Sequence, residues 1–304
     1  MALFQNLFSG KKGISSTTIK IIAVVTMLID HIGAILITYY DNKIVNFILR
    51  LIGRIAFPLF AFCLAEGFAH TSSRKKYAIR LLVAAIISEP AYNLAFAQMN
   101  IDFLKQQNVL FTFFIAFCVL WVIENIKNKD GLKFKKPLIV LTAITGMLLS
   151  ELIRAEYGCM GIVLVLVFYL LREKKLKLFI ISSLTYFFGY VLNLYIYEIY
   201  QFWYAYKSYM YSYELKKDLI THEPQFKFNL ESIIDQMGFV SGELWTYAVK
   251  SLLLGAIVAP AIIMIYNGKK GKAFPKLAFY IFYPAHLLLL WNLMQLIKYV
   301  NWIY

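Results

Sequence analysis

Long apolar stretches separated by short polar segments dominate the pattern of this chain. An α-helix of about 20 mostly apolar residues crosses the hydrocarbon core of a bilayer. We expect nine such spans, at 18–39, 45–69, 76–97, 108–126, 137–153, 158–171, 177–199, 244–266 and 276–297. The pattern predicts an all-α fold, a polytopic transmembrane helix bundle that forms a single domain over residues 1–304.

Basic residues gather in alternate loops of this predicted bundle. Most of the 31 Lys and Arg residues fall in five clusters, within 11–20, 74–80, 127–136, 172–177 and 269–276. The intervening loops carry few, apart from the long segment 200–243. Because basic loops stay in the cytoplasm, this alternation predicts a cytoplasmic N-terminus over residues 1–17 and an exterior C-terminus. We expect the chain to lie in a bacterial plasma membrane.

The amino-acid composition also indicates a protein whose main partner is the lipid bilayer. Hydrophobic residues make up 61% of the chain and charged residues 16%, against about 45–50% and 25% in soluble domains. The net charge of +14 does not indicate nucleic-acid binding, because the positive residues lie in short clusters between apolar runs. The three cysteines show no metal-ligand spacing and are expected to pack as small apolar residues. No metal is expected.

The segment 200–243 differs from the other predicted loops in its length and its many tyrosines. One interpretation is an aromatic belt with an interfacial helix outside the membrane. The alternative is a lid over a site that faces outward.

Ionisable residues within the predicted spans are the candidates for function, since burying a charge in a membrane is costly. They are Asp30, His31, Arg50, Arg54, Glu66, Glu89, Lys250 and His286. Acids and bases balance in this set, so a structural network of ion pairs is the simplest alternative. We expect Lys250 to extend toward the exterior interface, which removes it from the set.

Four predicted helices bring such residues to a similar depth, in the outer half of the membrane. Asp30 and His31 lie past the middle of the first span, toward the exterior, and Arg50 and Arg54 share one face of the second. Glu89 and Asn93 are also four residues apart, and His286 lies near the middle of the last span. This convergence predicts a site.

A histidine beside a carboxylate is suited to act as a general base, and two arginines are suited to stabilise an oxyanion or hold a phosphate. Asp30 and His31 point about 100° apart on a helix, so Glu89 or an acid from another helix is expected to orient His31. His31 lies about 18 Å along the helix from Ile19. A donor entering from the cytoplasm therefore needs a long, thin arm, as the pantetheine arm of an acyl-CoA provides.

The segments around these residues resemble the TraX family of membrane proteins over most of the chain. The resemblance is carried by Met27–Gly33, Arg50–Phe62, Glu66–Phe68, Arg74–Ala78, Arg80–Leu82, Ser88–Pro90, Gln107–Thr112, Tyr157–Gly158 and Phe282–Leu287. The chain is similar, more distantly, to the membrane acyltransferase-3 group and the heparan glucosaminide N-acetyltransferase type, which carry a histidine in an early span.

The resemblance implies an acyltransferase, because the conjugation-linked member of the family acetylates the N-terminus of a pilin subunit. Acetyl-CoA or a related thioester would be the donor, and the acceptor a pilin-like peptide, a glycan or a lipid head group. His31 would be the general base or a transient acyl carrier. Arg50 and Arg54 would contact the donor or the oxyanion. Glu89, Asn108 and His286 would complete the pocket. Taking residues and resemblance together, we expect Asp30, Glu89 and His286 to act with His31 in catalysis, and Asn93 and Asn108 to join the two arginines in binding substrate or donor.

Two other classes of function remain open from the residues alone. In a transporter or flippase the buried charges would bind a substrate or relay protons. In a scaffold they would only hold the bundle together. An inverted repeat would favour the transporter, and the sequence shows none.

Overall fold

The structure is a computed structural model, and it describes residues 13–40, 42–96, 106–192, 254–272 and 275–303. Within these residues every long element is a helix, and the extended pairings are two isolated bridges, Ile14 with Tyr266 and Gln107 with Ala155. The prediction of an all-α chain is therefore confirmed. Residues 200–243 and Lys250 lie outside the described residues.

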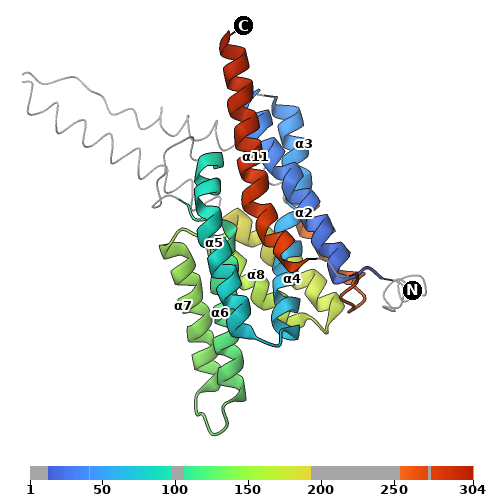
Figure 1. The fold of residues 1–304 in the computed structure, drawn as a ribbon. Coiled ribbons are helices and arrows are strands. Elements are labelled where there is room, and N and C mark those ends of the chain that lie inside the picture. Colours follow the sequence, from blue (N-terminus) through green and yellow to red (C-terminus); the bar gives the residue numbers. More distant parts are fainter. Residues whose placement is uncertain (1–12, 41, 97–105, 193–253, 273–274, 304) are drawn as a thin grey trace, which may run out of the picture.

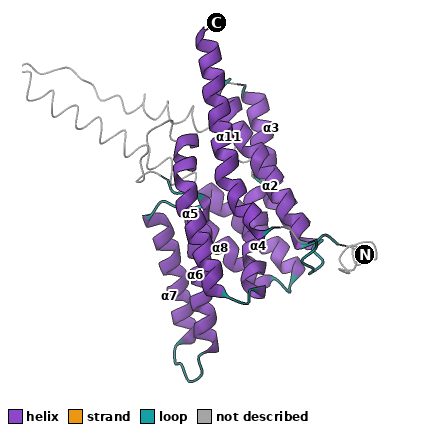
Figure 2. Cartoon of the chain, in the orientation of Figure 1, coloured by secondary structure: helices purple, strands orange, loops and turns teal. Residues whose placement is uncertain are grey.

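The helices form a bundle joined by short loops (Figures 1 and 2). In chain order they are α2 (Ser16–Ile32), the π-helix η1 (Gly33–Ile37), α3 (Lys43–Gly53), α4 (Ala56–His70), α5 (Arg74–Phe96), α6 (Val109–Asn128), α7 (Lys135–Leu152), α8 (Gly158–Leu171) and α11 (Lys276–Ile303). Two further helices, Lys175–Leu192 and Leu254–Met264, are named here by their residues. α5 packs on α6 and α11, α2 on α3 and α4, and α8 on α4, α6 and α7.

Six described helices are long and apolar enough to cross a membrane. They are Ser16–Ile37, Lys43–His70, Arg74–Phe96, Val109–Asn128, Lys175–Leu192 and Leu277–Asn301. α8 and Leu254–Met264 are shorter, and α7 does not belong to the six. At 14 residues, α8 is about 21 Å long, less than the ~30 Å hydrocarbon core. The number of nine spans and the cytoplasmic N-terminus stay predictions.

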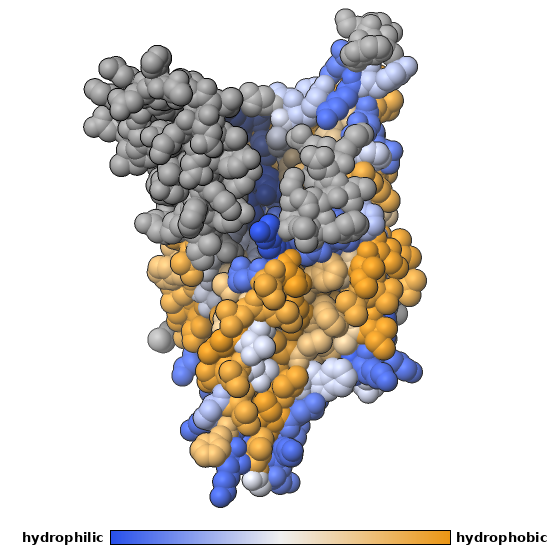
Figure 3. Space-filling model, turned by 90° about the vertical axis from the view of Figure 1, so that its left-hand side faces the viewer, coloured by the Kyte–Doolittle hydropathy of each residue, from blue (hydrophilic) through white to orange (hydrophobic). Residues whose placement is uncertain are grey.

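The outer surface of the bundle exposes many large apolar side chains. Large apolar side chains are exposed on α2, α5, α7 and α11, among them Val25, Ile87, Leu148 and Leu289. Figure 3 shows an apolar band around one face, with hydrophilic residues below it. So many exposed apolar residues on a folded chain mark a surface that meets a membrane or another apolar partner.

The span predicted at 45–69 is two helices with a break at Arg54. Proline at position 58 has no N–H to donate to the carbonyl of Arg54, four residues earlier. The hydroxyl of Tyr186 donates to that carbonyl instead, at 3.1 Å. The carbonyl of Arg54 therefore keeps a hydrogen-bond partner despite the break. Arg54 itself lies in the turn between α3 and α4.

The basic clusters gather at one end of the described bundle. The chain before α2 runs alongside the loop before α11, with the N–H groups of Ile14, Ser16 and Thr17 donating to the carbonyls of Ile265, Lys269 and Lys270. The loops after α4, α6 and α8 reach this end as well, because α4, α6 and α8 all run toward it (Figure 1). The site residues lie toward the other end, where α3 begins and α5 ends.

Candidate functional site

Two histidines from the first and last described helices form the centre of the site. Nδ1 of His31 lies 2.6 Å from Nε2 of His286, and the two rings are stacked at 4.9 Å between centroids. Both side chains are buried. Phe96 and Tyr283 contact the His31 ring edge-on. The π-helix η1 begins two residues after His31, an irregularity that is frequent at functional sites.

The hydrogen bonds of His286 assign the proton positions in this pair. Nδ1 of His286 lies 2.7 Å from the carbonyl of Phe282, so it must carry the proton and donate. In a neutral imidazole the other nitrogen is then an acceptor. His286 Nε2 therefore accepts from Nδ1–H of His31, and the lone pair of His31 is left on Nε2. A histidine held in this tautomer is ready to accept a proton at Nε2.

Beside the histidines lies an ion pair between α2 and α3. Nη1 of Arg50 donates to Oδ2 of Asp30 at 2.5 Å. Gly53 makes room for it, since a Cβ at position 53 would clash with the side chain of Asp30. The other carboxylate oxygen, Oδ1, is buried and has no hydrogen-bond partner among the described residues. Asp30 thus pairs with Arg50 and does not hydrogen-bond His31.

Arg54 presents the second cation of the site. Its guanidinium lies over the ring of Tyr190, 5.0 Å from the centroid, and Asp30 acts on it electrostatically. Its Nε is buried and has no hydrogen-bond partner within the described residues. An unused donor on a buried cation is suited to bind an anionic or carbonyl oxygen of a ligand.

Glu156 is a site residue that the sequence analysis missed. It lies in the loop between α7 and α8, and Asp30, Arg50 and Arg54 all act on it electrostatically. Sequence reasoning considered only ionisable residues inside predicted spans, and Glu156 falls between two of them. The Tyr157–Gly158 turn next to it, noted for its resemblance, was the signal available.

The loop that carries Glu156 is held in a strained conformation. Arg154 and Tyr157 have φ of 54° and 65°, which L-residues adopt at a cost of about 1–3 kcal/mol each. Backbone hydrogen bonds with Gln107, at 3.0 and 2.9 Å, and the hydroxyl of Thr112, which donates to the carbonyl of Glu156, fix the loop against α6. Such strain is concentrated at functional sites in proteins.

Glu89 belongs to a separate network that joins α5 to α6. Its carboxylate accepts from the backbone N–H of Asn108 at 3.1 Å, from Asn108 Nδ2 at 2.5 Å and from Asn93 Nδ2 at 3.1 Å. Asn108 also caps α6 by accepting from the N–H of Leu110. All three polar residues are buried. These hydrogen bonds pair the buried polar groups of Glu89, Asn93 and Asn108 with one another, so this part of the site is satisfied without a ligand.

Replacing Asn108 with alanine should lower the free energy of unfolding by about 2–4 kcal/mol. The change removes a helix cap and takes a side-chain donor from the buried carboxylate of Glu89. Unfolding in detergent, by heat or denaturant, measures the loss. Asn42 caps α3 in the same way, accepting from the N–H of Val45, but it is exposed. Asn42→Ala should therefore cost only about 1 kcal/mol, and equal losses would contradict the proposed network.

The structure brings five of the eight predicted site residues together and places three beside them. His31, His286, Asp30, Arg50 and Arg54 form the first group, and Glu89, Asn93 and Asn108 the second. Tyr283 contacts the rings of His31 and His286 edge-on, and Glu89 acts on it electrostatically. The group that hydrogen-bonds His31 is His286, where the sequence suggested Glu89 or another acid. The roles of all eight residues stay predictions.

Side chains that could bind a metal ion do not cluster in the part of the chain that the structure describes. No group of three or more His, Cys, Asp or Glu side chains there is placed to hold a metal ion. Cys63, Cys118 and Cys159 are unpaired thiols.

Comparison with known proteins relates the chain to one family. A family model described as TraX protein matches residues 15–211, a range that contains every predicted site residue except His286. A probable fimbrial assembly protein FimC, serogroup H1, of Dichelobacter nodosus is 26% identical over 286 residues, which cover 91% of this chain and 94% of that protein. No solved structure matches the chain.

Proposed function

This chain belongs to the TraX family, and from that premise we propose that it is a membrane acyltransferase. It moves an acetyl group from acetyl-CoA to an amine or hydroxyl of an envelope component. The observation that supports the proposal best is the chain of hydrogen bonds from the Phe282 carbonyl through His286 to His31. It leaves an unprotonated nitrogen on His31, and Arg50 acts on this histidine electrostatically.

The proposed reaction balances without a further reactant. His31 Nε2 takes the proton from the acceptor as the acceptor nitrogen or oxygen attacks the thioester carbonyl. Arg54 stabilises the negative charge that develops on the carbonyl oxygen. The carbon–sulfur bond then breaks, and the coenzyme A sulfur leaves with the proton that His31 returns. The products are the acetylated acceptor and the free thiol of coenzyme A.

The proposed topology gives the two substrates separate entrances. With nine spans and the N-terminus inside, the basic end of the bundle faces the cytoplasm of a bacterium and the His31 site lies in the outer half of the membrane. The donor then arrives from the cytoplasm and the acceptor from the exterior. One relative of this chain is named for fimbrial assembly, which favours an exported subunit of a pilus or fimbria as the acceptor.

Release of coenzyme A thiol tests the proposal. The purified protein in nanodiscs is incubated with acetyl-CoA and, in separate reactions, a pilin-like peptide, a cell-surface glycan or a phospholipid. We expect thiol release above the protein-free rate with one of these acceptors. An absence of release with all three acceptors and with a total envelope extract would refute an acyltransferase, and the buried charges would then be tested as a transport site.

Removing His286 tests its role as a positioning residue. His286→Ala should lower kcat by about 10–100-fold, because His31 loses the partner that fixes its tautomer, while KM for acetyl-CoA stays within about twofold. His286→Gln supplies a carbonyl acceptor for Nδ1–H of His31 and should recover part of kcat. An unchanged kcat in His286→Ala would contradict the assignment.

A further inference from the structure

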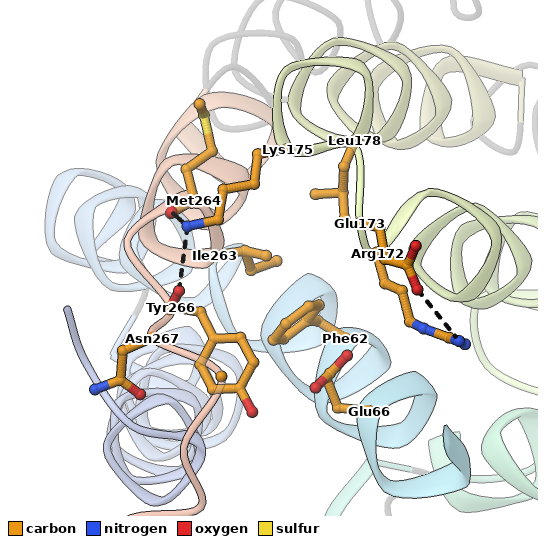
Figure 4. A pocket seen from close by; sticks show the side chains of 11 residues that line it. Phe62, Glu66, Arg172, Glu173, Lys175, Leu178, Ile263, Met264, Tyr266 and Asn267 are labelled. Atoms are coloured by element: carbon orange, nitrogen blue, oxygen red, sulfur yellow. Dashed lines mark hydrogen bonds and ion pairs between the residues drawn. The ribbon is translucent and has the colours of Figure 1, made fainter. Parts of the chain in front are cut away.

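The cavity in Figure 4 lies at the basic end of the bundle, away from the two site histidines. Its volume is about 340 Å³, and its charged lining residues are two acids and two bases, Glu66, Glu173, Arg172 and Lys175. Arg172 pairs with Glu173 at 3.7 Å, and Lys175 donates to two backbone carbonyls. The two cations of this cavity therefore already have partners within the protein. Beside the histidines, by contrast, lies a buried polar group that no described residue binds.

This group is the hydroxyl of Tyr283, on α11. The residue is 4% exposed, and its Oη has no hydrogen-bond partner among the described residues. Buried polar atoms are nearly always paired in folded proteins, and an unpaired one lowers stability. A group kept in this state at a functional site is suited to bind a ligand atom.

The ring of Tyr283 lies against both histidines of the site. It meets the His31 ring edge-on at 6.4 Å between centroids and the His286 ring at 5.8 Å. His286 follows Tyr283 by three residues, so one turn of α11 places both the hydroxyl and the partner of His31. The hydroxyl therefore belongs to the surroundings of His31, where the acceptor and the thioester carbonyl must meet if His31 is the base.

The loop between α7 and α8 relates this hydroxyl to Arg54. Glu156 and Tyr157, in that loop, both act electrostatically on Tyr283. The same two residues also interact electrostatically with Arg54. Because such interactions weaken with distance, Tyr283 and Arg54 border the same part of the site. Nε of Arg54 is a second buried donor there without a partner among the described residues.

Two other tyrosines near Arg54 already hold it in place. The hydroxyl of Tyr186 donates to the Arg54 carbonyl at 3.1 Å, and the ring of Tyr190 lies under the guanidinium, 5.0 Å from its carbon. Tyr283 differs from both, because its ring contacts the histidines while its hydroxyl is unused.

Two unused donors near a histidine base match the needs of acyl transfer. Negative charge develops on the carbonyl oxygen as the acceptor attacks, and donors fixed in advance stabilise it. We propose that the hydroxyl of Tyr283 and Nε of Arg54 together bind the carbonyl oxygen of the acyl donor, which makes Tyr283 a second catalytic donor to the oxyanion. Tyr283 keeps its proton throughout, while the proton of the acceptor passes to His31 and then to the leaving sulfur. The proposal rests on the acyl transfer proposed above.

Tyr283→Phe tests this role, because it removes the hydroxyl and keeps the ring against the histidines. We expect kcat for thiol release to fall about 100-fold, the lower end of the range for one lost oxyanion donor, since a neutral hydroxyl binds an anion less strongly than a guanidinium does. KM for acetyl-CoA should stay within about twofold. The matched control is Tyr169→Phe on α8, at the basic end, where the hydroxyl donates to Glu124 at 2.8 Å. It should leave kcat within about twofold of the wild type.

Thermal unfolding in the absence of substrate separates a catalytic hydroxyl from a structural one. Because the Tyr283 hydroxyl has no partner, Tyr283→Phe should melt at or above the wild-type temperature. Tyr169→Phe loses a paired hydroxyl and should melt lower. A melting temperature of Tyr283→Phe as low as that of Tyr169→Phe would assign the Tyr283 hydroxyl to the fold and overturn the proposal.

A double variant tests whether the two donors bind one oxygen. Groups that act as a unit have non-additive effects, so Tyr283→Phe should lower kcat by only about tenfold or less in the Arg54→Gln background. A full 100-fold fall in both backgrounds would contradict a shared oxygen.

The outcomes also separate this proposal from the one it rests on. An active wild type and an equally active Tyr283→Phe would overturn the role of Tyr283 and leave acyl transfer by His31 in place. A wild type that releases no thiol with any acceptor would overturn both.

Discussion

His31→Ala should lower the rate of acetyl transfer by about 10²–10⁴-fold, the usual contribution of a general base. The expectation follows from the hydrogen bonds of the site, because Nδ1–H of His31 is engaged by His286 and Nε2 is left to accept the proton. The effect should fall on kcat, and acetyl-CoA should still bind. The measurement is the steady-state rate of thiol release in nanodiscs.

His70 provides the matched control for this substitution. It is the last residue of α4, at the basic end of the bundle, and its side chain is 71% exposed. Among the ionic groups that the structure describes, its ring contacts only Glu66. His70→Ala should leave kcat and KM within about twofold of the wild type. Equal kcat values for the wild type and the folded His31→Ala protein would rule out His31 as the base.

Arg54→Gln should lower kcat by about 10²–10³-fold, the range found when one donor to an oxyanion is removed. Arg54 is the cation of the site with an unused buried donor, since Arg50 is paired with Asp30. Lysine at this position keeps the charge but lacks the planar group that lies over Tyr190, so Arg54→Lys should recover only part of kcat. Single-turnover thiol release separates this chemical step from donor binding.

Arg74 is the control for the second substitution, because it lies at the start of α5, at the basic end, and stacks on Phe68. Arg74→Gln should leave kcat unchanged. If Arg54→Gln raised only KM, with kcat intact, Arg54 would bind the donor equally in the ground state and would not stabilise the oxyanion.

The sequence pattern predicted the helices of this chain well, because each apolar stretch needs a continuous run of backbone hydrogen bonds in lipid. The described bounds of α5, α6 and α8 lie within about two residues of those expected. The break in the second span was harder to see. It depends on Pro58 and on a hydroxyl from Tyr186, a residue 132 positions away from Arg54, and no local pattern reveals such a partner.

The sequence predicted the depth of the site residues but not their pairing. Depth along a span can be counted from residue numbers, and it brought His31, Arg54 and His286 to a common level. Pairing between helices cannot be counted, because it depends on how each helix is rotated. Thus the partnership of His31 with His286, and that of Glu89 with Asn108, emerged only from the fold. Glu156 was missed because a loop can reach the level of a membrane site without belonging to a span.

The most direct test of the central claim follows a radiolabelled acetyl group from donor to acceptor. Labelled acetyl-CoA and a bacterial envelope extract are added to nanodiscs that hold the wild type, His31→Ala or His70→Ala. We expect covalent label on an envelope component with the wild type and His70→Ala, and none above background with His31→Ala. Label that stays on coenzyme A with the wild type, or that transfers equally well with His31→Ala, would contradict acyl transfer by this site.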